Sequence, residues 1–222
     1  MYRLRKAFRG LVFASLIVGV ACGLVFLVIV SESGRLPLQP CTPGSESLAE
    51  GASGEAKELL KTRNFEASAN AIDDLKAGIV DKRLVATLQT LAGQHRICVD
   101  AFKEGHYFLP GVKDGPLIPD SYGEAGGLPN THYYGRAADI RRIDGEPVRG
   151  NGTDPNILDL GRRIAGIPAQ QRPDQIIGPQ SWTDTLERSG EEGWILDEDQ
   201  LKLHEDHIHL GYMSEDGTWN VR

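Results

Sequence analysis

The chain has 222 residues, of which 40 % are hydrophobic, and 31 acidic against 24 basic side chains give a formal net charge of −7. This composition excludes a polytopic membrane protein and an intrinsically disordered chain. Four basic residues lie before position 31 and no acidic residue does, so residues 31–222 carry a net charge of −11. That acidity argues against a nucleic-acid-binding surface, and the length predicts one globular domain.

Residues 11–30 form an apolar run without a charged side chain. About 20 residues at a rise of ~1.5 Å each match a hydrocarbon core of ~30 Å. The basic residues precede the run and Glu32 follows it, which predicts a cytoplasmic N-terminus and an extracytoplasmic remainder. A cleavable signal peptide is the alternative, but its apolar region is usually shorter, about 7–15 residues, and is followed by a small-x-small site, which residues 28–31 do not supply. We therefore expect a single-pass transmembrane anchor over residues 1–30, in the cell membrane.

Residues 31–54 are rich in Pro, Gly and Ser and show no apolar periodicity, which predicts a flexible linker. The extracytoplasmic domain is then expected over residues 55–222. It begins with a helical pattern in three stretches: residues 56–60, 67–76 and 81–94.

Alternating apolar residues and turn signals predict strands in the second half of the chain. These strands are residues 96–102, 136–143, 176–178 and 207–212. Asp154 stands at an N-cap position and opens a helix over residues 155–165. Helices followed by short strands with long connections predict an α+β fold, with a small antiparallel sheet packed by helices.

Three cysteines are too few for a scaffold built on disulfides, and Cys22 lies within the apolar run. Cys41 and Cys98 remain as one possible bridge in an oxidising compartment. The sequence does not reveal the distance between their Cα atoms, so the paired and unpaired states both stay open.

Four of the six histidines lie in two short segments, one beginning at Thr131 and the other at residue 204. His207 and His209 are two apart on a predicted strand, so both rings should point to the same face. His132 and Asp139 flank the start of an earlier strand. Two imidazoles and one carboxylate, with a fourth position open to water, form a typical catalytic zinc site.

The segment from Thr131 to Asp139 reads Thr-x-x-x-Gly-Arg-Ala-x-Asp and resembles the Ser-x-His-x-x-Gly-x-Ala-x-Asp signature of the zinc D-Ala-D-Ala peptidases, with the His next to the leading hydroxyl residue. The segment Asp206-His207-Ile208-His209 resembles that family's closing acid-x-x-His. It equally resembles the His-x-His of the wider lysostaphin, D-Ala-D-Ala metallopeptidase and hedgehog superfamily. The resemblance covers roughly residues 84–212, and it implies that His132, Asp139 and His209 bind Zn²⁺.

The same resemblance leaves the general base open between two residues. Asp206 stands at the position of the acid, one methylene shorter than the usual Glu, whereas strand parity favours His207. The family also tends to place a substrate-binding Arg after the first strand, where this chain has Lys103 and His106. Arg141 is expected at a solvated strand end, although it shares the parity of Asp139.

The resemblance implies a membrane-anchored zinc metallopeptidase that hydrolyses peptide bonds of peptidoglycan stems, next to D-Ala, as a carboxypeptidase or an endopeptidase. The alternative is a non-catalytic module that keeps the peptidase fold and binds peptidoglycan or a protein. The sequence does not indicate the oligomeric state.

Overall fold

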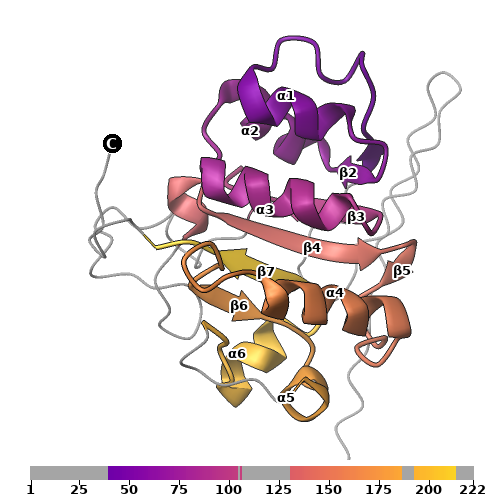
Figure 1. The fold of residues 1–222 in the computed structure, drawn as a ribbon, viewed down its shortest axis with the longest axis vertical. Helices are drawn as coiled ribbons and strands as arrows, with labels where there is room; N and C mark the ends of the chain where they lie inside the picture. Colours follow the sequence, from indigo (N-terminus) through magenta and orange to yellow (C-terminus); the bar gives the residue numbers. More distant parts are fainter. Residues whose placement is uncertain (1–39, 105, 107–130, 187–192, 214–222) are drawn as a thin grey trace, which may run out of the picture. The chain divides into compact units, whose positions relative to one another are not determined.

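The computed structural model describes residues 40–104, 106, 131–186 and 193–213. Within them lie six α-helices, one 3-10 helix and seven strands (Figure 1). The helices are α1 (Gly54–Lys61), α2 (Ala69–Ala77), α3 (Lys82–Ala92), α4 (Pro155–Gly166), α5 (Trp182–Thr185), α6 (Glu198–Leu203) and the 3-10 helix η2 (His132–Tyr134). The strands are β1 (Thr42–Pro43), β2 (Phe65–Ala67), β3 (Ile97–Ala101), β4 (Ala137–Ile143), β5 (Glu146–Pro147), β6 (Gln175–Ile177) and β7 (Ile208–Gly211).

All seven strands belong to one sheet with the order β1-β2-β3-β4-β7-β6, and β5 pairs with β4. The predicted α+β class is therefore correct. The prediction of an antiparallel sheet is wrong at one place, because β2 and β3 run parallel. The two strands are joined by the α2–α3 segment, and a helical crossover of this kind is what a parallel pair requires.

The longer predicted elements are confirmed to within a few residues. Helix α4 begins after Asp154, whose carboxylate accepts hydrogen bonds from the backbone N–H groups of Asn156 and Ile157. The expectation that only helices precede the strand at residue 97 is wrong, because β1 and β2 come before it. These strands have two and three residues, too few for an alternating pattern to be seen in the sequence.

The predicted linker is partly described. Its residues 40–54 contain β1, and Ala49 is buried in the apolar core. Cys41, just before β1, forms a disulfide with Cys98 of β3, with their Cα atoms 6.0 Å apart. The folded part thus begins earlier in the chain than the Pro- and Gly-rich composition indicates.

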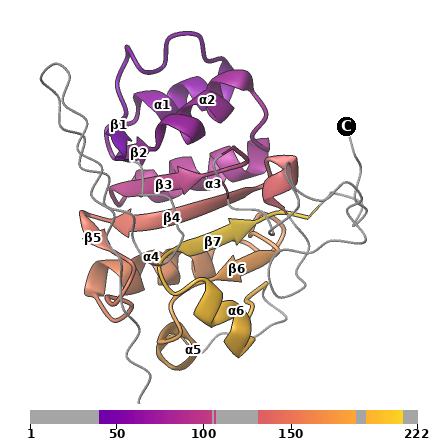
Figure 2. The same cartoon turned by 180° about the vertical axis from the view of Figure 1, so that it is seen from behind.

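The two faces of the sheet have different roles. Helices α3 and α4 cover one face (Figure 1), where Ile140 of β4 and Leu210 of β7 join the apolar core with Leu88 of α3. Side chains alternate between the faces along a strand, so Asp139 and His209 point to the opposite face, seen in Figure 2. Packing of the apolar core on one face therefore holds in place the strands that carry the predicted site on the other face.

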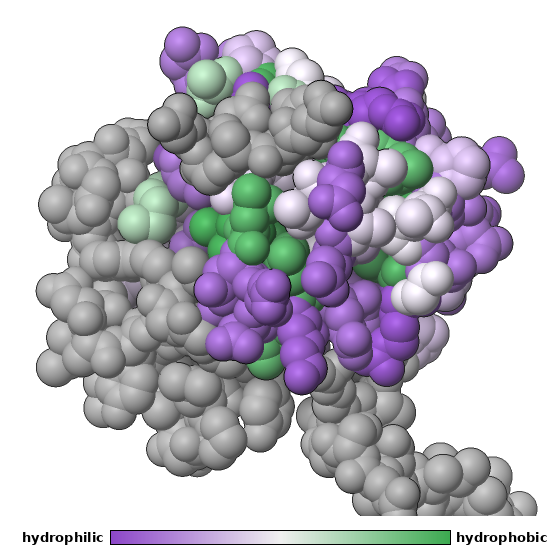
Figure 3. Space-filling model, turned by 90° about the horizontal axis from the view of Figure 1, so that it is seen from below, coloured by the Kyte–Doolittle hydropathy of each residue, from purple (hydrophilic) through white to green (hydrophobic). Residues whose placement is uncertain are grey.

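No helix among the described residues is long and apolar enough to span a membrane. The predicted anchor over residues 1–30 lies outside the described residues. The large hydrophobic side chains exposed in the described part are Ile79 and Leu203, each 40 % accessible. Figure 3 shows one face, on which a small hydrophobic area lies beside hydrophilic side chains.

Candidate metal centre

Three of the sequence-predicted residues meet on the sheet face away from α3 and α4. Asp139 of β4 lies directly opposite His209 of β7 in the antiparallel register. His132 opens η2, which ends at Gly135 in the left-handed conformation with a φ of 67°. A side chain at Gly135 would also collide with the backbone carbonyl of Ile79, so this turn requires glycine.

The atoms of these three side chains converge. His132 Nε2 lies 3.1 Å from Asp139 Oδ1 and 3.2 Å from His209 Nδ1, and His209 Nδ1 lies 3.3 Å from Asp139 Oδ1. Ligand atoms at ~2.0–2.1 Å from a tetrahedral zinc ion are about 3.3–3.4 Å apart. The three separations therefore match those between the ligands of one such ion.

The outer nitrogens of both rings are already committed as donors. His132 Nδ1–H donates to the backbone carbonyl of Phe102, and His209 Nε2 lies 3.3 Å from the side-chain oxygen of Gln175. Thr131 Oγ1–H also donates to that oxygen, at 3.0 Å. Such outer contacts fix the tautomer and the orientation of metal-binding histidines.

With those protons placed, the inner nitrogens of the two neutral rings carry lone pairs that face each other and a carboxylate. Three acceptor atoms within 3.3 Å repel one another unless a cation lies between them. All three residues are buried, so water cannot screen the repulsion. The chemistry of this donor set therefore fits a metal ion.

The protonation states agree with that assignment. Burial alone would raise the pKa of Asp139, but the neighbouring His132 and His207 hold it well below its usual range. Burial lowers the pKa of His209 to about 3, against the opposing effect of its contact with Asp139. A carboxylate and a neutral imidazole are the forms that bind a metal.

The two candidate bases occupy successive positions beside this cluster. His207 lies just before β7, and its Nε2 is 3.4 Å from Asp139 Oδ1, as strand parity predicts. Its Nδ1–H donates to Asp206 Oδ1 at 2.8 Å, and Arg149 pairs with the other oxygen of Asp206. Asp206 thus orients His207 from behind, while His207 faces the centre.

In the sequence, His106 stands out only as a departure from the family pattern, and the structure places it beside the centre. Its ring stacks on that of His132, with centroids 3.8 Å apart, and its Nε2 lies 3.8 Å from Asp139 Oδ2. His106, His132 and Asp139 each offer a ligand atom within 4.8 Å of the others, so this group could also hold a metal ion. Burial, followed by the neighbouring His132, lowers the pKa of His106 well below its usual range.

His204 is a fifth histidine near the cluster. Its ring centroid lies 5.0 Å from that of His207 and 5.5 Å from that of His209. Its Nδ1–H donates to the carbonyl of Gln200 in α6, and burial, followed by His207, lowers its pKa to about 4. A neutral ring at this position packs against the centre without adding a charge.

The prediction that Arg141 lies at a solvent-exposed strand end is wrong. It is only 7 % exposed, and its Nη1 lies 2.9 Å from Asp100 Oδ1. Its Nε lies 3.3 Å from the sulfur of Cys98. Its charge is therefore balanced by Asp100 beside the disulfide.

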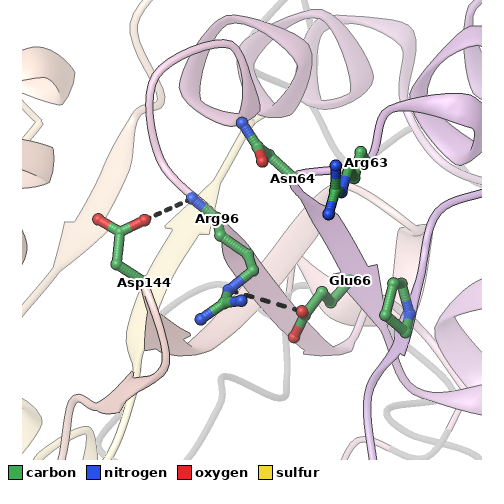
Figure 4. Close-up of a pocket in the computed structure, with 6 residues that line it drawn as sticks. Arg63, Asn64, Glu66, Arg96 and Asp144 are labelled. Carbon is green, nitrogen blue, oxygen red and sulfur yellow. Dashed lines mark hydrogen bonds and ion pairs between the residues drawn. The ribbon is translucent and has the colours of Figure 1, made fainter.

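A pocket of about 450 Å³ lies elsewhere, between the starts of β2 and β3 and the turn after β4 (Figure 4). Its charged side chains are largely paired: Arg96 Nε lies 3.7 Å from Glu66 Oε1, and Asp144 accepts from the backbone N–H of Arg96. The candidate chemistry is thus in the histidine cluster and not in this hollow.

Comparisons with family models, with curated proteins and with solved structures found no match to this chain.

Proposed function

We propose that the protein is a zinc metallopeptidase of the D-Ala-D-Ala peptidase type. The observation that supports this most directly is the convergence of His132 Nε2, Asp139 Oδ1 and His209 Nδ1 within 3.3 Å, with the outer ring nitrogens already engaged. A set of three protein ligands leaves a fourth position for water or substrate, as catalytic zinc sites do.

His132, Asp139 and His209 would hold the ion. When bound, zinc supplies a Lewis acid that activates water and polarises the scissile carbonyl. His207 takes the proton from the attacking water and passes it to the leaving amine. Its Nδ1–H bond to Asp206 keeps Nε2 available as the acceptor, so Asp206 acts through His207.

The substrate class follows from the sequence resemblance. We propose peptide bonds of peptidoglycan stems next to D-Ala as the target, reached outside the cell membrane by a domain tethered through residues 1–30. The acidic surface argues against nucleic acid as a partner.

His106 supports a second candidate, a non-catalytic module that binds peptidoglycan or a protein. Its Nε2 is near enough to Asp139 to serve as a fourth protein ligand after a small movement. A site closed by four protein ligands has no position for an activated water and is typical of structural zinc.

One experiment separates the candidates. The full chain, purified in mild detergent without chelators, is assayed for metal by elemental analysis and incubated with purified wall peptides, whose products are identified by mass. One zinc ion with products cleaved beside D-Ala supports the peptidase. Zinc with binding but no cleavage supports the module, and a chain that takes up no metal on titration contradicts both zinc-containing assignments.

A further inference from the structure

Asp74 is a buried acid on the side of α2 that faces the sheet. Asp74 is only 2 % exposed, and its Oδ2 accepts hydrogen bonds from the backbone N–H groups of Lys103 and Glu104, each at 2.9 Å. Burying a carboxylate is costly unless it is well hydrogen-bonded. Two charge-assisted bonds to one turn are therefore a strong local constraint.

That turn contributes two groups to the candidate metal centre. Phe102, next to Lys103, provides the carbonyl that accepts from His132 Nδ1–H. His106, two positions after Glu104, stacks on the ring of His132. The position of the turn after β3 thus sets both the orientation of one proposed ligand and the place of the additional histidine.

The start of α2 also contacts the end of β3. Ser68, the N-cap residue of α2, donates its backbone N–H to the carbonyl of Val99 and its hydroxyl to the carbonyl of Asp100. Together with Asp74, it ties α2 to four residues at the end of β3 and beyond: Val99, Asp100, Lys103 and Glu104. Of these contacts, only those of Asp74 reach beyond the end of the strand.

We infer that Asp74 is a positioning residue of the metal centre, which holds the Phe102 carbonyl against His132 and sets the place of His106. This inference rests on the proposed function, since it takes the centre to bind a metal. Asp74 touches none of the proposed ligands and acts through the backbone of the turn. Loss of an outer contact made directly to a ligand, such as that of the Phe102 carbonyl to His132, typically weakens metal binding by about 10- to 100-fold, and Asp74 lies one step further from the ligands.

The test uses the full chain in detergent, titrated with Co²⁺ by visible absorption and with Zn²⁺ in competition with a coloured chelator. Asp74→Ala should weaken binding by up to about 10-fold, the lower end of the range for direct outer contacts, and change the Co²⁺ spectrum, and Asp74→Asn, which keeps an acceptor oxygen, should show a smaller loss. The matched control is Asp73→Ala, because Asp73 is the exposed neighbour on the same helix. It should bind as the wild type does.

Each outcome is decisive. A wild type that binds neither ion refutes the metal centre itself. A wild type that binds, with Asp74→Ala equal to Asp73→Ala in affinity and spectrum, overturns the positioning role even if its thermal stability is reduced. If Asp74→Ala does not fold, a folded Asp74→Asn with wild-type affinity and spectrum overturns the inference instead.

Discussion

Among the described residues, buried histidines meet carboxylates in two clusters, which are built differently. His95 has Asp144 Oδ2 at 2.7 Å from Nδ1 and Asp159 Oδ2 at 2.9 Å from Nε2, with Arg163 beside it. An N–H on either ring nitrogen therefore has an acceptor, and the cluster is complete without an ion. At the centre of His132, Asp139 and His209, the inner nitrogens and the carboxylate face one another as acceptors. The pattern of hydrogen-bond donors and acceptors, more than the residue types, therefore distinguishes a structural cluster from a candidate metal site.

The largest effect is expected from variants that remove a proposed ligand of the centre and leave the His95 cluster intact. His209→Ala and Asp139→Ala should each weaken zinc binding by more than the ~100-fold typical of outer contacts, because two ligands rarely hold zinc against water. His95→Ala should keep one zinc ion per chain. Metal content and chelator competition on the purified variants measure both effects. Equal loss of zinc in His95→Ala would remove the distinction.

The next largest effect is expected on the rate of cleavage, in variants that still bind the metal. His207→Gln should lower the rate of wall-peptide cleavage by about 10² to 10⁴, the usual share of general acid and base catalysis, with zinc content unchanged. Asp206→Asn should cost less, because Asp206 only orients the ring. The exposed Asp199→Asn on α6 is the control. If Asp206→Asn alone abolishes cleavage, Asp206 is the base and His207 is the residue that orients it.

A smaller effect is expected on the free energy of unfolding when the His95 cluster is changed. His95→Ala leaves Asp144 and Asp159 without the donor between them, and should lower the free energy of unfolding by about 1–3 kcal/mol. Urea unfolding at neutral pH measures it, with exposed Gln94→Ala as the control. A His95 variant as stable as the Gln94 variant would show that the cluster contributes nothing measurable.

The smallest effect is expected at Asp81, a carboxylate with an ordinary ion pair outside the centre. Burial would raise the pKa of Asp81, but its bonds to Arg83 outweigh burial and lower it. The stabilisation is present above the unfolded-state pKa and is lost as the pH falls through the lower folded-state pKa. Asp81→Asn should therefore cost up to about 1 kcal/mol at pH 6–7, and the difference should vanish towards about pH 2. Urea unfolding over this pH range measures the difference, with the exposed Asp73→Asn as the control. A difference in unfolding free energy that does not change with pH would show that the charge of Asp81 is irrelevant.

Much of the centre could be predicted from sequence because it lies on regular strands. Period-2 alternation correctly placed His207 and His209 towards the same carboxylate, Asp139, and antiparallel pairing then brought β7 beside β4. His132 was named from the clustering of histidines and from the resemblance of residues 131–139 to the peptidase signature. The ion, the reaction and the substrate stay predictions.

Other features had no local signal. His106 follows the end of a strand and carries no periodic pattern, so nothing in the sequence places its ring against that of His132. The parallel pairing of β2 with β3 depends on a three-residue strand. The disulfide depends on the distance between two Cα atoms 57 positions apart in the chain, which only the assembled sheet sets.

That disulfide also determines how the domain would bear tension. A pull arriving at Cys41 from the preceding chain passes through the covalent bond to Cys98 in β3. Residues 42–97, which include α1, α2 and α3, form a closed loop outside that load path. If the chain is tethered as proposed, drag from the cell wall is carried directly by an interior strand of the sheet. Helix α2, which contacts the turn after β3, then lies outside the covalent path of that load and would join it only after reduction of the bond.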